Sequence, residues 1–313
     1  MIISASRRTD IPAFYARWFM QRIAEGFVVV RNPRNALQFR RVELTPDRVE
    51  ALVFWTRNPA PLLAGLDELD RLGHRYLFHY TITGYPRALE SHVPELPTAI
   101  RQFCALSDRI GPGRLAWRYD PILFSNWTPP GEHARHFAAI ARQLAGKTQR
   151  VVISLLDLYA KSCRNLDAIP GLSYQDPRQM PGELAALLPE LAAIAQQYGM
   201  TIHSCAEEPD LSSTGIQPGK CIDEQWLNVE FGLQLAGRKD PGQRSACQCI
   251  PSVDIGQYNT CLHGCAYCYA TWSPSSAQRL LARHDPKSPL LIGGAEEVPD
   301  ALRQPTTIQP SLW

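Results

Sequence analysis

Short apolar runs alternate with amphipathic segments through the first two thirds of the chain, and this alternation restricts the possible folds more than any other feature. The runs predicted to form strands are Ile2–Ser6, Ala51–Trp55, Tyr76–Ile82, Leu115–Arg118, Val151–Leu156 and Met200–Ser204. The segments predicted to form helices are Pro12–Ile23, Pro61–Leu72, Thr98–Ile110, Glu132–Leu144 and Gly182–Gln197. Phe27–Val30 and Gln38–Leu44 are predicted to be two further β segments outside this alternation. Strands separated by helices usually lie parallel, so the sequence predicts an α/β fold around a parallel sheet.

Polar residues follow nearly every predicted strand. In a parallel barrel all carboxyl strand ends converge on one face, where barrel active sites lie, whereas an open doubly wound sheet brings only a few together. No glycine-rich phosphate-binding motif follows a strand. We therefore expect a TIM-barrel-like parallel β/α barrel, full or partial, of roughly six to eight strands. Residues 1–210 would form the barrel, and residues 211–313 an irregular, cysteine-rich segment packed on its mouth.

The strand-end residues supply the candidate catalytic groups. These are Arg8, Asp10, Arg57, His79, Arg118, Asp120 and His203. Guanidinium groups offer paired donors to a carboxylate or phosphate, and a histidine can act as an acid, a base or a ligand. The alternative is that the charges form salt bridges at one end of the barrel and that each histidine is a structural residue.

Three cysteines stand close together in the string Cys261-Leu-His-Gly-Cys265-Ala-Tyr-Cys268. Three thiolates can hold three irons of a [4Fe–4S] cluster and leave the fourth iron open to a small molecule. Tyr267 precedes the third cysteine and can shield the sulfurs from water. The alternatives are unpaired core thiols or a zinc site whose fourth ligand is His263 or a distant cysteine.

This spacing, with an aromatic residue before the third cysteine, resembles the signature of the radical S-adenosylmethionine (SAM) enzymes. The blocks Ser6-Arg-Arg-Thr-Asp-Ile-Pro12, Phe54-Trp-Thr-Arg-Asn-Pro59, His203-Ser-Cys-Ala-Glu-Glu208 and Asp254–Ala270 resemble the DUF1848 family, whose reaction is unassigned. The radical-SAM resemblance implies a [4Fe–4S] cluster on Cys261, Cys265 and Cys268 that binds SAM. In ordinary radical-SAM enzymes, however, the cysteine loop follows the first strand of the barrel.

Four further cysteines precede the signature, namely Cys205, Cys221, Cys247 and Cys249. Four thiolates could complete a second metal site, either an iron–sulfur cluster or zinc. They could equally be buried apolar thiols, because free cysteine is among the most buried residue types. Cys104 and Cys163 are expected to be structural.

The overall composition excludes some classes of protein. The formal net charge is only +2, which gives no support for nucleic-acid binding. No apolar run approaches the roughly 20 residues that span a bilayer, and Met1–Arg8 does not resemble a secretory signal. We therefore expect a cytoplasmic protein that does not contact a membrane.

Two functions fit these patterns. The first is a radical-SAM-like enzyme that acts on a small-molecule substrate and receives electrons from a donor such as flavodoxin or ferredoxin. The second is a metal-binding protein without radical chemistry, in which a cluster or zinc fixes the C-terminal segment and the polar face binds a small ligand or serves electron transfer.

Overall fold

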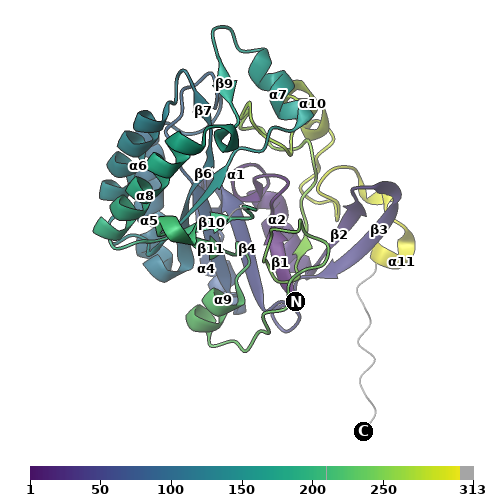
Figure 1. Ribbon diagram of the computed structural model, residues 1–313. Coiled ribbons are helices and arrows are strands. Elements are labelled where there is room, and N and C mark those ends of the chain that lie inside the picture. The colour runs from purple at the N-terminus through teal and green to yellow at the C-terminus, as the bar shows by residue number, and fades with distance from the viewer. Residues whose placement is uncertain (209, 304–313) are drawn as a thin grey trace.

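Eight parallel strands form the central sheet of the computed structural model, which describes residues 1–208 and 210–303 (Figure 1). Their order across the sheet is β11-β10-β8-β6-β5-β4-β1-β12. The strands are β1 (Ile2–Ala5), β4 (Ala51–Thr56), β5 (Tyr76–Thr81), β6 (Leu115–Ile122), β8 (Arg150–Leu155), β10 (Thr201–Cys205), β11 (Gln217–Gly219) and β12 (Val253–Asp254). A separate hairpin of β2 (Phe27–Asn32) and β3 (Asn35–Glu43) stands out from the body, and β7 (Phe124–Ser125) pairs with β9 (Tyr174–Gln175).

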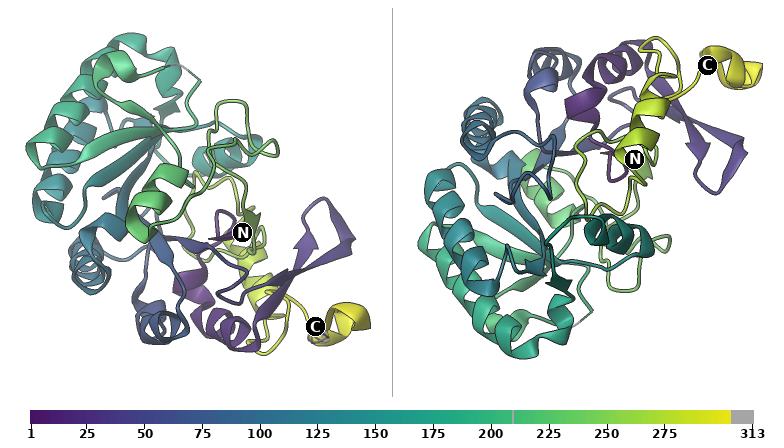
Figure 2. Two further views of the ribbon diagram at one scale, coloured as in Figure 1. Left: turned by 90° about the horizontal axis from the view of Figure 1, so that it is seen from below. Right: turned by 90° about the horizontal axis from the view of Figure 1, so that it is seen from above.

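The long helices lie together on one side of the sheet (Figure 2). The helices are α1 (Ile11–Phe14), α2 (Ala16–Glu25), α3 (Ala60–Leu63), α4 (Leu66–Leu72), α5 (Leu96–Ile110), α6 (Pro130–Leu144), α7 (Ala160–Asp167), α8 (Pro181–Gln197), α9 (Glu224–Phe231), α10 (Pro274–Leu281) and α11 (Asp300–Arg303). Right-handed crossovers between successive neighbouring strands place their helices on the same face. Within the described ranges, no helix is both long and apolar enough to cross a bilayer.

The predicted α/β fold with a parallel sheet is confirmed. From β1 to β11 the strands follow one another across the sheet in chain order, which is not the order of a doubly wound sheet. A closed barrel is not observed: β11 and β12 stand at opposite edges, and no ladder joins them in the part of the chain that is described. Sequence patterns missed β11 and β12 because strands this short show no periodicity.

Both faces of the sheet are buried. Leu52 and Phe54 pack in the core beneath the helices, whereas Ala51 and Val53 pack in a second cluster on the opposite face. This division follows from the alternation of side chains along a strand. The residues that cover the second face come from the region after β11, namely Cys221, Ile222, Trp226, Leu227, Cys247, Cys249 and Ile250. We call this covered surface the inner face.

Candidate functional site

The three clustered cysteines lie on a loop, residues 259–270, that we call the cysteine loop. Its ends meet through a hydrogen bond from Asn259 N to Ala270 O at 2.9 Å. Its middle docks on the segment after β5, where Ala266 N donates to Leu89 O at 2.9 Å and the backbone of Glu90 bridges that of Cys265. Gly264 has φ of +67°, a conformation that residues with a Cβ rarely adopt. The loop is therefore attached to the carboxyl end of β5, although it is more than 170 positions away in the sequence.

Asp10 joins the end of β1 to the cysteine loop. One oxygen of its carboxylate contacts both the backbone N of Arg57 and Nε2 of His263, each at 2.7 Å. The other oxygen accepts from Ala13 N at 2.9 Å and caps α1. Nδ1 of His263 lies 3.4 Å from His92 O, so both ring nitrogens already face partners. His263 is therefore not placed as a fourth metal ligand, contrary to one alternative raised by the sequence.

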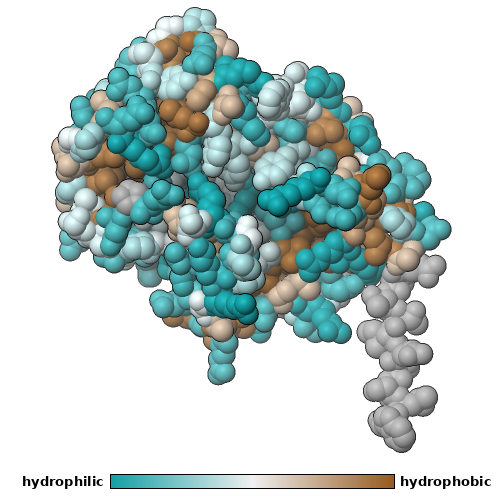
Figure 3. All heavy atoms as spheres, turned by 45° about the vertical axis from the view of Figure 1, so that its right-hand side comes forward, coloured by the Kyte–Doolittle hydropathy of each residue, from teal (hydrophilic) through white to brown (hydrophobic). Residues whose placement is uncertain are grey.

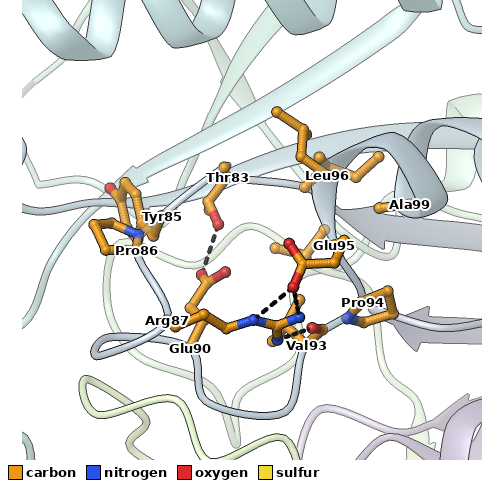
Figure 4. Close-up of a pocket in the computed structure, with 13 residues that line it drawn as sticks. Thr83, Tyr85, Pro86, Arg87, Glu90, Val93, Pro94, Glu95, Leu96 and Ala99 are labelled. Atoms are coloured by element: carbon orange, nitrogen blue, oxygen red, sulfur yellow. Dashed lines mark hydrogen bonds and ion pairs between the residues drawn. The ribbon is translucent and has the colours of Figure 1, made fainter.

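Arg57 and Glu90 form a buried ion pair below the loop, with Nη1 and Oε1 at 2.9 Å. The same carboxylate oxygen accepts from Thr83 Oγ1 at 2.6 Å (Figure 4). It also accepts from the hydroxyl of Tyr267. Nη2 of Arg57 donates to the Tyr267 hydroxyl at 2.6 Å. Tyr267, which the sequence suggested as a shield for the sulfurs, thus also fixes the loop to the sheet. Sequence patterns missed Glu90 because it follows a proline-rich loop and does not directly follow a strand.

The three cysteines are partly exposed as residues, yet two of their sulfurs lie in desolvated surroundings. Burial, together with Cys268 and Asp10, holds the pKa of Cys261 well above its ordinary value. Burial also raises the pKa of Cys265 to about 12, although the Arg57 guanidinium acts in the opposite direction. The metal-free thiols of Cys261 and Cys265 are therefore protonated at neutral pH, and metal binding would release their protons.

No group of three or more His, Cys, Asp or Glu side chains converges as the ligand set of one metal ion within residues 1–208 and 210–303. In a [4Fe–4S] cluster each thiolate binds a different iron, so its thiolates lie farther apart than three ligands of one ion. This finding therefore bears on a single-ion site and not on a cluster.

Polar groups without partners lie on both sides of the cysteine loop. The buried hydroxyls of Thr9, next to Asp10, and Thr271, after Cys268, have no hydrogen-bond partner among the described residues. A hollow of about 240 Å³ lies behind the loop-docking segment and is lined in part by Thr83, Arg87 and Glu90 (Figure 4). Buried polar groups normally find partners, and the hydroxyls of Thr9 and Thr271, which do not line this hollow, are exceptions.

The four remaining clustered cysteines meet on the inner face, and we call them the inner thiol cluster. The sulfurs of Cys205 and Cys221 are 3.0 Å apart. Cys221 also contacts the Cys249 thiol, which in turn contacts Cys247. Two thiolates on one zinc ion lie about 3.8 Å apart when each bond is about 2.3 Å long. The four thiols thus lie close together, as the hypothesis of a second metal site expects, but a metal would have to move the sulfurs of Cys205 and Cys221 apart.

The inner thiols lie in a charged environment. Nη1 of Arg118 lies 3.0 Å from the sulfur of Cys221, and its Nε donates to Asp120 at 2.8 Å. A contact with Cys249 lowers the pKa of Cys247 to about 7, whereas the contact with Cys221 and burial hold the pKa of Cys205 well above its usual value. Cys247 therefore supplies thiolate at neutral pH.

The candidate acid–base residues fall into different places. His79 is buried on the inner face, where it stacks on Trp55 and its Nε2 contacts Cys221 O at 2.7 Å. Burial and Arg118 hold its pKa well below the usual value, and burial lowers that of His203 to about 4. Both rings are therefore neutral near pH 7, which does not suit a general acid.

Arg118 and Asp120 form a buried pair beside the inner thiols. Burial tends to raise the pKa of Asp120, but the Arg118 guanidinium lowers it below its ordinary value overall. Arg8 is more accessible: its Nη1 lies 3.5 Å from Gly256 O, and its guanidinium lies over the ring of Tyr258. The predicted residues thus divide between the cysteine loop (Asp10, Arg57), the inner face (His79, Arg118, Asp120, His203) and the rim (Arg8).

Comparisons with known proteins give one informative result. A comparison with curated proteins finds no significant match. Among solved structures, a short-chain type dehydrogenase/reductase from Mycobacterium marinum aligns with 81% of this chain and 92% of its own, at 10% identity and a TM-score of 0.24, which is too low to carry an argument. The family model described as "Domain of unknown function (DUF1848)" matches residues 2–270. That range includes the cysteine loop as well as the sheet, and the chain therefore belongs to the DUF1848 family.

Proposed function

We propose that the protein is an iron–sulfur enzyme of the radical-SAM type, with a [4Fe–4S] cluster held by Cys261, Cys265 and Cys268. One observation carries the proposal: contacts from Asp10, Arg57 and Glu90 fix the cysteine loop at the carboxyl ends of β1, β4 and β5. This edge is where α/β enzymes bind their substrates. Compared with ordinary radical-SAM enzymes, the cysteine loop would then come later in the chain but lie at the same edge of the sheet.

The open parallel sheet supports this proposal because it resembles a partial β/α barrel. From β1 to β11 its strands follow chain order and its long helices lie on one side, as in a β/α barrel that has not closed. A cluster bound on the loop would supply an electron for the reductive cleavage of SAM at its open iron. A flavodoxin or ferredoxin would be a suitable electron donor, and the substrate would be a small molecule or a group exposed at the same edge.

The chain's own residues have separable roles. Arg57 is a positioning residue, because Glu90 and Tyr267 occupy both ends of its guanidinium. Asp10 orients His263 and thereby the first turn of the loop. Arg8 has a partly exposed side chain, and although its Nε lies 3.9 Å from Asp254 Oδ1, its guanidinium could also bind a carboxylate of SAM or substrate. The unpartnered hydroxyls of Thr9 and Thr271 offer further hydrogen bonds.

The experiment uses protein produced and purified without oxygen. Wild type is expected to contain iron and sulfide, to show a broad brown absorption and to cleave SAM when reduced. A Cys261→Ala/Cys265→Ala/Cys268→Ala variant should lose the iron, the sulfide and the cleavage. The matched control is Cys104→Ala/Cys163→Ala, because neither residue belongs to a cluster. Full iron and sulfide in the triple variant would contradict the assignment.

The contacts between the inner thiols favour a second metal site on Cys205, Cys221, Cys247 and Cys249. Either zinc or a second iron–sulfur cluster would match four thiolates. The loop variant without Cys261, Cys265 and Cys268 should then retain metal, and further replacement of Cys205 and Cys247 by Ser should remove it. A loop variant that is folded and metal-free would reject this second site.

The alternative function is a metal-bound scaffold without radical chemistry. The observation that favours it is the number of contacts by which the cysteine loop ties β1, β4 and β5 together. A wild-type protein that holds the cluster but does not cleave SAM under strong reduction would support the scaffold.

A further inference from the structure

Exposed aromatic side chains gather around the cysteine loop. Tyr258, Tyr269 and Trp272 lie immediately before, within and after the loop, and they are 38%, 46% and 52% exposed. Tyr159, which is 42% exposed, lies with its ring 6.3 Å from that of Tyr269. Large aromatic rings rarely remain exposed together without a partner. We call these four residues the aromatic surface.

Cationic side chains lie against the same rings. The guanidinium of Arg8 is 5.3 Å from the centre of the Tyr258 ring, and Lys161 Nζ is 5.9 Å from it. The guanidinium of Arg164 lies 4.0 Å from the centre of the Trp272 ring, and it also donates to Trp272 O. Rings and cations therefore lie side by side on a surface that three distant regions of the chain build together.

A basic hollow continues this surface toward the β2–β3 hairpin. It has a volume of about 470 Å³ and is lined by Arg8, Arg31 and Arg40 as well as by Asp254. Asp254 is bonded to Ser4, Ser6 and the backbone N of Arg7 and lies 3.9 Å from Arg8 Nε. Arg31 pairs with Glu297. Figure 3, which turns the hairpin side forward, shows a largely hydrophilic and hollowed face.

Two arginines of the hairpin add unpaired charge. The side chains of Arg34 and Arg40 are exposed and have no ion-pair or hydrogen-bond partner among residues 1–208 and 210–303. Asp157, the acidic residue nearest in sequence to Tyr159, is paired with Arg178 and Arg244. The unpaired positive charge at this surface therefore comes from Arg34 and Arg40, even though the whole chain has a formal net charge of only +2.

We propose that the aromatic surface and the basic hollow bind a single-stranded nucleic acid, with bases stacked on Tyr258 and Trp272 and phosphates near Arg8, Arg40 and Arg164. Exposed aromatic rings interleaved with arginines are the means by which proteins bind unpaired strands, because every base has a face that can stack. A duplex hides those faces. The surface surrounds the cysteine loop, so a bound strand would present its bases to the proposed active site.

The test is direct binding, measured by fluorescence anisotropy with a labelled DNA strand of about 20 nucleotides, longer than the site of one stacking domain. Neither reductant nor SAM is present, so failure of this inference and failure of the proposed chemistry are distinguishable. The strand should bind more tightly than its duplex, and its affinity should fall as salt rises. Trp272→Leu and Tyr258→Leu should each weaken binding about tenfold.

Arg164→Gln should weaken binding and reduce the salt dependence, whereas Arg142→Gln, an exposed arginine on α6, should change neither. Unaltered melting temperatures would show that the variants are folded, as expected for half-exposed side chains. Equal affinities of Trp272→Leu and wild type, or tighter binding of the duplex, would overturn the proposal. Absence of any strand binding would also overturn it and turn attention to a protein partner.

Discussion

Arg57 and Glu90 form a 2.9 Å ion pair below the cysteine loop, where the two side chains are only 10% and 5% exposed. The pair does not stand alone, because Thr83 and Tyr267 donate to the same carboxylate. Its four members come from the end of β4, the end of β5, the segment after β5 and the loop itself. A buried ion pair gains stability only when further hydrogen bonds support it, and here Thr83 and Tyr267 bond the same oxygen of Glu90 while Tyr267 accepts from Nη2 of Arg57.

Glu90→Gln should therefore be strongly destabilising. The substitution keeps the shape of the side chain but leaves the buried guanidinium of Arg57 without its countercharge, a change that typically costs about 3 kcal/mol. Urea unfolding at neutral pH measures the difference. Glu95→Gln is the matched control, because Glu95 pairs with Arg87 at an exposed site where such pairs contribute about 1 kcal/mol or less. Equal effects of the two substitutions would show that the buried pair does not secure the loop.

Gly264→Ala should disturb the cysteine loop locally. The residue has φ of +67°, and an added Cβ would collide with Ser91 Oγ and approach His92 Nδ1 to 3.0 Å. The conformational penalty alone is about 1 kcal/mol. We expect lower stability together with a reduced iron content in anaerobically purified protein. Gly131→Ala is the control, because its Cβ would meet nothing within 4 Å; it should leave the iron content unchanged.

His133 should make stability depend on pH. Its ring is buried between Tyr119 and Leu123, and burial lowers its pKa to about 4, against about 6.5 in the unfolded chain. Between these values the unfolded state binds more protons, so the free energy of unfolding falls as the pH falls from about 6.5 to 4. The loss should approach about 3 kcal/mol.

The measurement compares urea unfolding of wild type and His133→Gln across this pH range. Because the other titrating groups contribute equally to both proteins, the difference between the two curves isolates His133. A constant difference from pH 7 to pH 4 would show that the pKa of His133 is the same in the folded and unfolded proteins, so that burial does not lower it.

The sequence predicted the main strands and helices well. A continuous apolar run such as Ala51–Trp55 is typical of a parallel strand that is buried on both faces. It also placed Asp10 and Arg57 correctly at one edge of the sheet. It did not separate Arg57, which lies beyond the end of β4, from His79 and Arg118, whose side chains point to the inner face. That distinction depends on the residue at which each strand ends. It also depends on which alternate residues of the strand point toward the core beneath the helices. Glu90 could not be predicted, because its partners lie 7, 33 and 177 positions away.

The link between Asp10 and His263 leads to the last prediction, which concerns the motion of the cysteine loop. Asp10→Ala removes the acceptor for His263 and Arg57 N and also the cap of α1. The cysteine loop should then open more often, so the amide of Ala266, which donates to Leu89 O, should exchange its hydrogen faster. Hydrogen exchange followed by mass spectrometry of peptides from residues 259–270 gives the readout. Asp108→Ala, at an exposed ion pair with Lys147, is the control and should leave these peptides unchanged. Faster exchange throughout the sheet would mean that Asp10 supports the whole fold, whereas faster exchange confined to the loop would identify Asp10 as its anchor.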